Sequence, residues 1–164
     1  MVGVDGSELS DAAVDRAASV AVMTGAPLVL VSAYDVRRRR DLCGAADVLK
    51  REAYLIHGST PVDEILRTAE ERAAASGVHR IVRRAVPGPL AKAILGVAGA
   101  TGAAMLVVAD HDAGTRKGRW LGTLSGEIRR HSLVELLVVT AAADVLEPVP
   151  AVRRRWLPTI STAG

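Results

Sequence analysis

Short apolar runs alternate with segments of helical periodicity along most of this chain, and this alternation restricts the fold more than any other feature. Residues 28–31 and 105–108 contain only Leu, Val and Met, which is typical of parallel strands that are covered on both faces. Strands that alternate with helices favour a parallel sheet with helices on both faces and right-handed crossovers. The sequence therefore predicts a doubly wound α/β domain with a five-stranded parallel sheet.

The individual elements follow from local signals in the sequence. Strands are predicted over residues 1–4, 28–34, 78–86, 104–109 and 134–140, and helices over 8–24, 61–76, 90–100 and 123–131. Thr60 before Pro61 is a helix start signal, and Gly25 followed by Pro27 is a stop signal. Arginines alternate with Ile and Val over 78–86, which indicates a strand near a sheet edge. Residues 35–59 are predicted to form a loop or lid, with a helix over 45–56 as an alternative.

Composition restricts the class of protein. The chain has 164 residues, 49% of them hydrophobic and 24% charged, which fits one globular domain. Aromatic residues make up only 2%, with no Phe, so the core must consist of Ala, Val, Leu and Ile. No apolar run reaches the roughly 18 residues of a membrane span, and no signal-peptide pattern is visible, so we expect a cytoplasmic protein. The lone Cys43 predicts neither an internal disulfide nor a thiolate metal site.

The positive charge of the chain is concentrated in two runs. The formal net charge is +3, and the excess comes mainly from residues 37–40 and 153–155. Nucleic-acid binders usually interleave such charges with stacking aromatic residues, which are scarce here, so nucleic-acid binding is not expected. A basic rim that attracts anionic ligands or an acidic partner fits the pattern better.

A Gly-rich turn over residues 109–123 is the strongest candidate for a ligand site. It lies between a predicted buried strand and a predicted helix, where glycines let the backbone approach a ligand and the helix offers unpaired N–H donors to an anion. Two positions where such a turn favours Gly hold Ala109 and Asp112. The carboxylate of Asp112 repels a phosphate unless a cation lies between them.

The topology predicts which other residues surround this turn. In doubly wound folds, ligands bind beyond the carboxyl ends of the strands. This rule brings Gly3 and Asp5, Ala33 and the turn over 109–123 into one crevice, which is wide enough for an adenosine-sized ligand.

Metal binding and catalysis have little support in the sequence. Asp110, His111 and Asp112 are adjacent, so they point in different directions and lack the spacing of a metal site, although Mg²⁺ could bridge Asp112 to the phosphates of ATP. The Walker pattern is absent because Lys117 precedes Gly118, and there is no Ser-His-Asp set. Asp5 could orient a water molecule, but it could equally cap the following helix. We therefore expect a binding domain with no catalytic residue and no metal site of its own.

Several motifs together resemble the universal stress protein family. They are Val2-Gly3-Val4-Asp5-Gly6-Ser7, Gly25-Ala26-Pro27-Leu28-Val29-Leu30, and Leu121-Gly122-Thr123 leading through Arg130-His131 to Leu136-Leu137-Val138-Val139. The resemblance covers residues 1–141 and implies a fold like that of the adenine nucleotide alpha hydrolases. Residues 46–50 and 60–69 are similar to actinobacterial members, which include proteins that bind cyclic AMP.

The resemblance also implies a nucleotide site. The ATP-binding pattern of the family is Gly, two residues, Gly, nine residues, then Gly with Ser or Thr; this chain keeps the last pair and has Ala109 and Asp112 at the first two positions. By resemblance, Asp5 holds the adenine or ribose, Gly3 and Ala33 line the base pocket, and the stretch from Gly114 to Leu124 holds phosphate. The full implied set is Gly3, Asp5, Ala33, Ala109, Asp112, Gly114, Gly118, Gly122, Thr123 and Leu124.

Three functions stay open from the sequence. The first is a stress-response domain that binds ATP or cyclic AMP and signals its occupancy as a homodimer. The resemblance implies that the two copies pair through the strand from Leu136 to Thr140. The second is a member whose site has degenerated and which acts as an interaction module for an unknown protein partner. The third is a weak nucleotide hydrolase.

The two ends of the chain depart from the family pattern. Only four residues precede Asp5, so either the true start lies upstream or the central strand is weak. Residues 142–164 are basic and contain Pro148, Pro150 and Pro158, so we expect a disordered tail or a docking segment after the domain.

Overall fold

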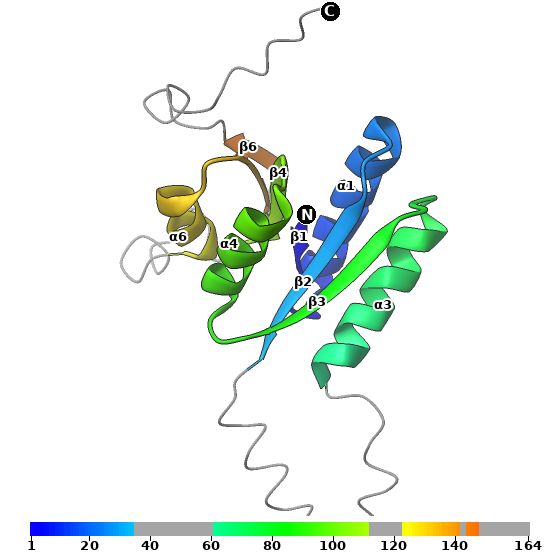
Figure 1. Cartoon of the computed structure of the whole chain (residues 1–164), viewed down its shortest axis with the longest axis horizontal. Helices are drawn as coiled ribbons and strands as arrows, with labels where there is room; N and C mark the ends of the chain where they lie inside the picture. Colours follow the sequence, from blue (N-terminus) through cyan, green and yellow to red (C-terminus); the bar gives the residue numbers. More distant parts are fainter. Residues whose placement is uncertain (35–60, 112–122, 142–143, 148–164) are drawn as a thin grey trace, which may run out of the picture.

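The chain forms a six-stranded sheet with helices on both faces (Figure 1). The computed structural model describes residues 1–34, 61–111, 123–141 and 144–147. The strands are β1 (Val2–Gly3), β2 (Leu28–Tyr34), β3 (Ile81–Pro87), β4 (Met105–Ala109), β5 (Glu135–Val139) and β6 (Asp144–Glu147). The helices are α1 (Glu8–Thr24), α3 (Pro61–Ala75), α4 (Leu90–Thr101) and α6 (Leu124–His131).

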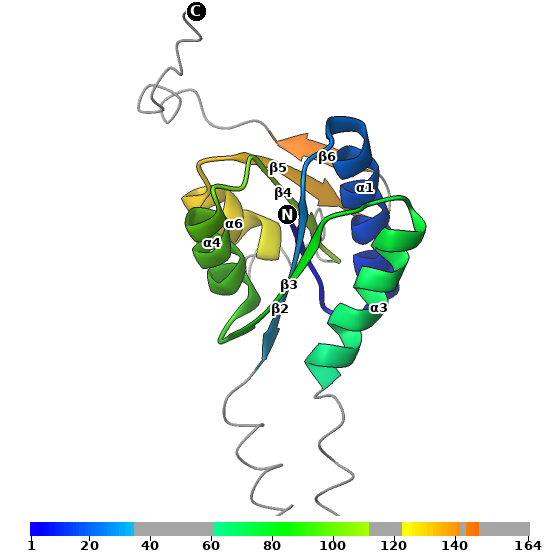
Figure 2. The same cartoon turned by 45° about the vertical axis from the view of Figure 1, so that its right-hand side comes forward.

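The strands lie in the order β3-β2-β1-β4-β5-β6, and all neighbours up to β5 are parallel. Helices α1 and α3 cover one face, and α4 and α6 cover the other, as the turned view shows (Figure 2). The two cores consist mostly of Ala, Val, Leu and Ile, as the composition predicts. None of the helices in the described part of the chain is long and apolar enough to cross a membrane.

Local signals account for the ends of the first helix. The hydroxyl of Ser7 accepts a hydrogen bond from the Ser10 N–H and so caps the start of α1. Gly25 ends the helix in the left-handed conformation, with φ of 65°, which an L side chain rarely adopts. The predicted stop signal at Gly25 is therefore confirmed.

The predicted α/β fold is confirmed, and the predicted strand over 78–86 is an edge strand, β3. The sheet has six strands in place of the five predicted. Residues 144–147, which fall in the predicted tail, form β6 and pair antiparallel with β5, from Leu136 opposite Glu147 to Val139 opposite Asp144. The predicted helix over 45–56 and the remainder of the tail lie outside the described residues.

The sixth strand also changes the expected dimer surface. β5 lies between β4 and β6, so the strand from Leu136 to Thr140 is not the edge of the sheet. Arg16 of α1 forms an ion pair with Asp144 of β6, with 2.6 Å between Nε and Oδ2. On this side the described sheet ends at β6, where Val145 and Leu146 are 47% and 56% exposed.

The centre of the sheet depends on the absence of a side chain at Gly3. A Cβ atom added there would lie 2.4 Å from Cδ1 of Ile94, a fully buried residue of α4. Gly3 therefore lets α4 pack directly against the short central strand β1.

We predict that Gly3→Ala lowers the free energy of unfolding by about 1–3 kcal/mol, the usual cost of overpacking. Ile94→Val removes the atom that clashes, so the double variant should lose less stability than the two single variants together. Chemical denaturation measures all three, with Gly99→Ala as the control because an added Cβ there meets nothing within 4 Å. Additive losses in the double variant would contradict this packing role.

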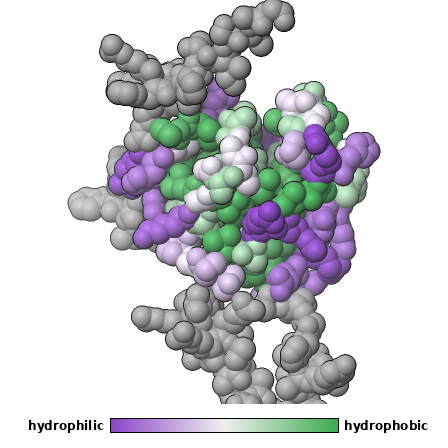
Figure 3. Space-filling model, viewed as in Figure 1, coloured by the Kyte–Doolittle hydropathy of each residue, from purple (hydrophilic) through white to green (hydrophobic). Residues whose placement is uncertain are grey.

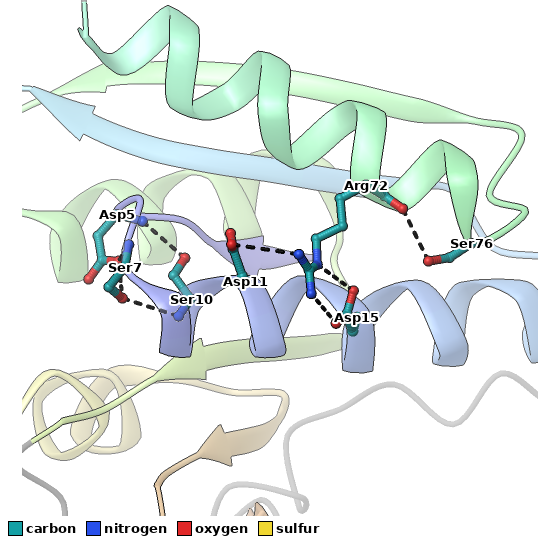
Figure 4. Close-up of polar contacts among 7 residues, drawn as sticks. All are labelled: Asp5, Ser7, Ser10, Asp11, Asp15, Arg72 and Ser76. Carbon is teal, nitrogen blue, oxygen red and sulfur yellow. Dashed lines mark hydrogen bonds and ion pairs between the residues drawn. The ribbon is translucent and has the colours of Figure 1, made fainter.

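An ion pair joins the two helices on one face of the sheet (Figure 4). The guanidinium of Arg72 in α3 donates to both carboxylate oxygens of Asp15 in α1, at 2.6 and 2.7 Å, and lies 3.6 Å from Asp11. The hydrogen bond from Arg72 lowers the pKa of Asp15 below its ordinary value. Hydrophilic residues gather over the part of the surface that α3 forms, at the right of Figure 3.

We predict that Arg72→Gln destabilises the protein near neutral pH by at most about 1 kcal/mol, because solvent screens this half-exposed pair. A lowered folded-state pKa of Asp15 stabilises the fold above the unfolded-state pKa, and this contribution is lost as the pH falls through the folded-state pKa. The difference between variant and native protein should therefore vanish in acid. Urea unfolding at several pH values measures it.

Arg67→Gln is the matched control, since Arg67 pairs only with Glu64 and Glu71 of its own helix among the ion pairs of the described residues. A larger effect for Arg67→Gln than for Arg72→Gln would show that the contact between α1 and α3 does not depend on this ion pair.

Candidate functional site

The carboxyl ends of β1, β2 and β4 meet at one edge of the sheet. β1 lies between β2 and β4, and the chain crosses from β1 to β2 on one side and reaches β4 on the other. Strand order reverses at this point, and ligands of doubly wound folds bind in the crevice that such a reversal opens. Asp5 follows β1 and Asp110 follows β4, so both carboxylates lie at this edge.

Hydrogen bonds order the turn between β1 and α1 (Figure 4). Oδ1 of Asp5 accepts from the Ser7 N–H at 2.9 Å and from the Ser7 hydroxyl at 2.7 Å. The Asp5 N–H donates to the buried hydroxyl of Ser10 at 3.2 Å. Gly6 has φ of 83°, which makes the tight turn possible. Asp5 thus holds the residue that caps α1 and does not bond the helix amides itself, while its side chain stays exposed.

A side-chain contact joins the turns that follow β1 and β4. Nε2 of His111 lies 3.0 Å from the hydroxyl oxygen of Ser7. That hydroxyl gives its only proton to Asp5, so it must accept from His111, and Nε2 must carry a proton. The turns after β1 and β4 are therefore joined through side chains.

The start of α6 lies beside the end of β4 at the same edge of the sheet. The hydroxyl of Thr123 caps the helix and accepts from the Gly126 N–H at 3.0 Å. The carboxylate of Asp110, which is only 4% exposed, accepts from the Ser125 N–H at 2.9 Å. The end of β4 and the first turn of α6 are thus held together by a buried hydrogen bond.

Besides the exposed Asp5, the predicted site residues fall into three groups. Gly3 and Ala109 are buried in the sheet, and Ala33, Thr123 and Leu124 are half-buried at the crevice edge. Asp112, Gly114, Gly118 and Gly122 lie outside the described residues. Close packing against Ile94 explains why residue 3 is a glycine. The predicted contact of Gly3 with a base stays a prediction.

Asp110 is the residue that the sequence interpretation missed. In the sequence it stands out only as part of a possible metal cluster with His111 and Asp112, whereas in the structure its side chain accepts from a helix amide. The described residues contain no group of three or more His, Cys, Asp or Glu side chains that could hold a metal ion. A carboxylate directly after a buried strand, followed by a Thr-x-Ser helix start, was the available signal.

A hollow of about 420 Å³ lies at the opposite edge of the sheet, at the amino ends of β2 and β4. Its lining is mostly apolar and includes Leu28, Met105 and the last turns of α1 at Ala21 and Thr24. The carboxyl end of a helix disfavours anions, so this hollow does not suit a phosphate. The crevice at the carboxyl ends is the better candidate for an anionic ligand.

We predict that the two histidines of this half of the molecule carry their neutral-state protons on different nitrogens. His111 should be protonated on Nε2 because it donates to Ser7, and His131 on Nδ1 because it faces the carbonyl oxygen of Glu127 at 3.1 Å. Long-range ¹H–¹⁵N correlation spectra above pH 8 distinguish the two tautomers. A proton on Nδ1 of His111 would contradict the hydrogen bond to Ser7, and a proton on Nε2 of His131 would contradict the one to Glu127.

Comparison with known proteins identifies the family of the chain. The pattern of the Universal stress protein family matches residues 1–140. The universal stress protein Rv1636 of Mycobacterium tuberculosis (strain ATCC 25618 / H37Rv) is 38% identical over 139 residues, which cover 85% of this chain and 93% of that protein. The chain therefore belongs to the universal stress protein family.

Solved structures support the fold. A crystal structure of a universal stress protein in complex with cAMP superposes with a TM-score of 0.68 at 32% identity, covering 84% of this chain and 92% of that one. A protein of the same family from Burkholderia pseudomallei gives a TM-score of 0.54 at 22% identity, covering 84% and 93%, and supports the fold alone.

Proposed function

We propose that this chain is a stress-response domain that binds an adenine nucleotide, cyclic AMP or ATP, at the carboxyl ends of β1, β2 and β4. The observation that carries the proposal is the junction of three elements at the strand-order reversal: the ordered Asp5–Ser7 turn, His111 after β4, and the capped start of α6. The similarity to a universal stress protein in complex with cAMP supports the choice of nucleotide.

Each predicted residue has a role in this proposal. Asp5 is exposed beside the crevice and accepts from a ribose hydroxyl or the adenine, while Gly3 and Ala33 lie on the side of the base. Thr123 and Leu124, at the start of α6, lie on the side of the phosphate together with the turn that contains Gly114, Gly118 and Gly122. With ATP, a Mg²⁺ ion offsets the like charge of Asp112.

The proposed mode of action is signalling by occupancy, in a homodimer. The outer edge of β5 is covered by β6, so pairing of two copies through the strand from Leu136 to Thr140 requires β6 to leave β5. An interaction module with a degenerate site is the second candidate function, and Ala109 and Asp112 in place of glycines favour it. A weak hydrolase is a third candidate, for which Mg²⁺-dependent release of phosphate above a site-variant control is the test.

Calorimetric titration with cyclic AMP and with ATP, with and without Mg²⁺, tests the proposal. We expect saturable binding of at least one nucleotide, weaker binding after Gly122→Val, and stronger ATP binding after Asp112→Gly, which removes a like charge. Gly99→Val on the exposed side of α4 is the control and should leave the affinity unchanged. A folded protein that binds neither nucleotide would favour the interaction module. Equal affinities for the native protein and both site variants would refute the assigned site.

A further inference from the structure

The short strand β6 covers the edge of β5 but buries little of its own surface. It spans Asp144–Glu147 and pairs antiparallel with β5 (Figure 2). Its two apolar residues, Val145 and Leu146, stay exposed although they lie in the sheet. The hydrophobic effect is roughly proportional to the apolar area removed from water. Burial of side chains therefore contributes little to holding β6 in place.

An ion pair with α1 adds to the pairing of β6. Nε of Arg16 lies 2.6 Å from Oδ2 of Asp144, and the two side chains are 60% and 31% exposed. Ion pairs that are open to solvent contribute little net free energy, because water and salt screen them. Ordering the four residues of β6 also costs conformational entropy, which these contacts must offset. β6 can therefore leave β5 at low cost.

The edge of β5 under this strand is suited to pairing. Apart from Glu135, β5 consists of Leu and Val. Its outer edge accepts an antiparallel strand, since β6 occupies it in that direction from Leu136 to Val139. A second copy of β5, related by a two-fold axis, would also run antiparallel and would place Leu and Val opposite each other. Apolar cross-strand pairs of this kind stabilise a sheet.

The outer edge of β6 suits a second copy less well. β6 begins and ends with an acidic residue. Antiparallel pairing of two β6 strands about a two-fold axis would therefore place acidic residues opposite each other, which destabilises a sheet. Short strands with charged residues are a common way to protect a sheet edge from other chains. These features favour β5 over β6 as the strand that pairs with a second copy.

We propose that β6 is a displaceable cover of the β5 edge, and that a second copy of this chain takes its place there. This inference rests on the homodimer of the proposed function and adds that each chain competes with its partner for the same edge. While β6 is paired with β5, the chain is monomeric. After β6 leaves, β5 pairs with β5 of the second copy. Dimerisation therefore depends on how firmly Arg16 and the β5 edge hold β6.

The test is a reversible disulfide between the two strands. Leu137 and Leu146 lie opposite each other, so Leu137→Cys with Leu146→Cys, in a Cys43→Ser chain, allows one disulfide that fixes β6 to β5. Oxidation is carried out at low protein concentration, and mass spectrometry verifies the bond. Sedimentation velocity then gives the dimer dissociation constant of the oxidised and the reduced protein. We expect a constant at least about tenfold higher after oxidation, because the lock removes the state that can dimerise.

Two further proteins keep this test decisive. The Cys43→Ser chain without the added cysteines is the control, and its dissociation constant should not differ between oxidising and reducing conditions. Val138→Cys with Val145→Cys replaces the first pair if that variant does not fold or does not form the bond. Opposed pairs along an antiparallel ladder alternate between a closer and a wider spacing, so one of these two neighbouring pairs has the closer spacing.

The ion pair supplies a second, independent test. Arg16→Gln leaves the sequence of β6 unchanged but breaks its contact with α1. We expect the dimer dissociation constant to fall by up to about fivefold, the usual range for an exposed ion pair. Asp144→Asn should act in the same direction, although the two variants change the net charge in opposite directions. Arg67→Gln, whose ion pairs lie within α3, is the control for Arg16→Gln and should leave the constant unchanged.

The outcomes separate this inference from the proposed function. If the native protein dimerises and the disulfide does not weaken the dimer, β6 is not a cover, and the proposed homodimer stands on another surface. Opposite shifts in Arg16→Gln and Asp144→Asn would also overturn the inference, since they would indicate an effect of net charge. Monomers in every sample up to millimolar concentration would refute the cover and the homodimer together. Calorimetry still decides nucleotide binding in each case.

Discussion

The close packing of α4 against the short central strand is the constraint on which the crevice depends. β1 has two residues, and it is held between β2 and β4 by parallel pairing on both sides and by Ile94 above Gly3. This arrangement places the turn after β1 beside the end of β4, so that Ser7 and His111 come into contact. Without a fixed central strand, the two turns that form the candidate site would have no common frame.

Capping hydrogen bonds order both helix starts at this edge of the sheet. Ser7 and Thr123 cap the starts of α1 and α6, and each of these caps lies beside a carboxylate, Asp5 in one case and Asp110 in the other. The Asp5 side chain stays exposed and is the one of the two that the proposed function assigns to a nucleotide. The buried Asp110 side chain accepts from the Ser125 N–H and joins the end of β4 to the start of α6.

Local patterns in the sequence predicted the parallel sheet, the helices and the edge position of β3, because these depend on periodicity and stop signals within each segment. β6 was missed because Asp144–Glu147 has only two apolar residues, and its pairing depends on the neighbouring edge of β5. The roles of Gly3 and Asp110 also depend on distant partners, Ile94 and Ser125, that no local pattern reveals. Asp112 and the glycines of the turn stay predictions.

A ¹H–¹⁵N spectrum of the labelled protein during titration with cyclic AMP tests the central claim most directly, since it reports where a ligand binds as well as whether it binds. The account predicts shifts that saturate and concentrate at Asp5, Ser7, His111 and Leu124, with Thr24 and Met105 at the opposite edge unaffected. Shifts confined to that opposite edge, or a spectrum unchanged at millimolar nucleotide, would contradict it.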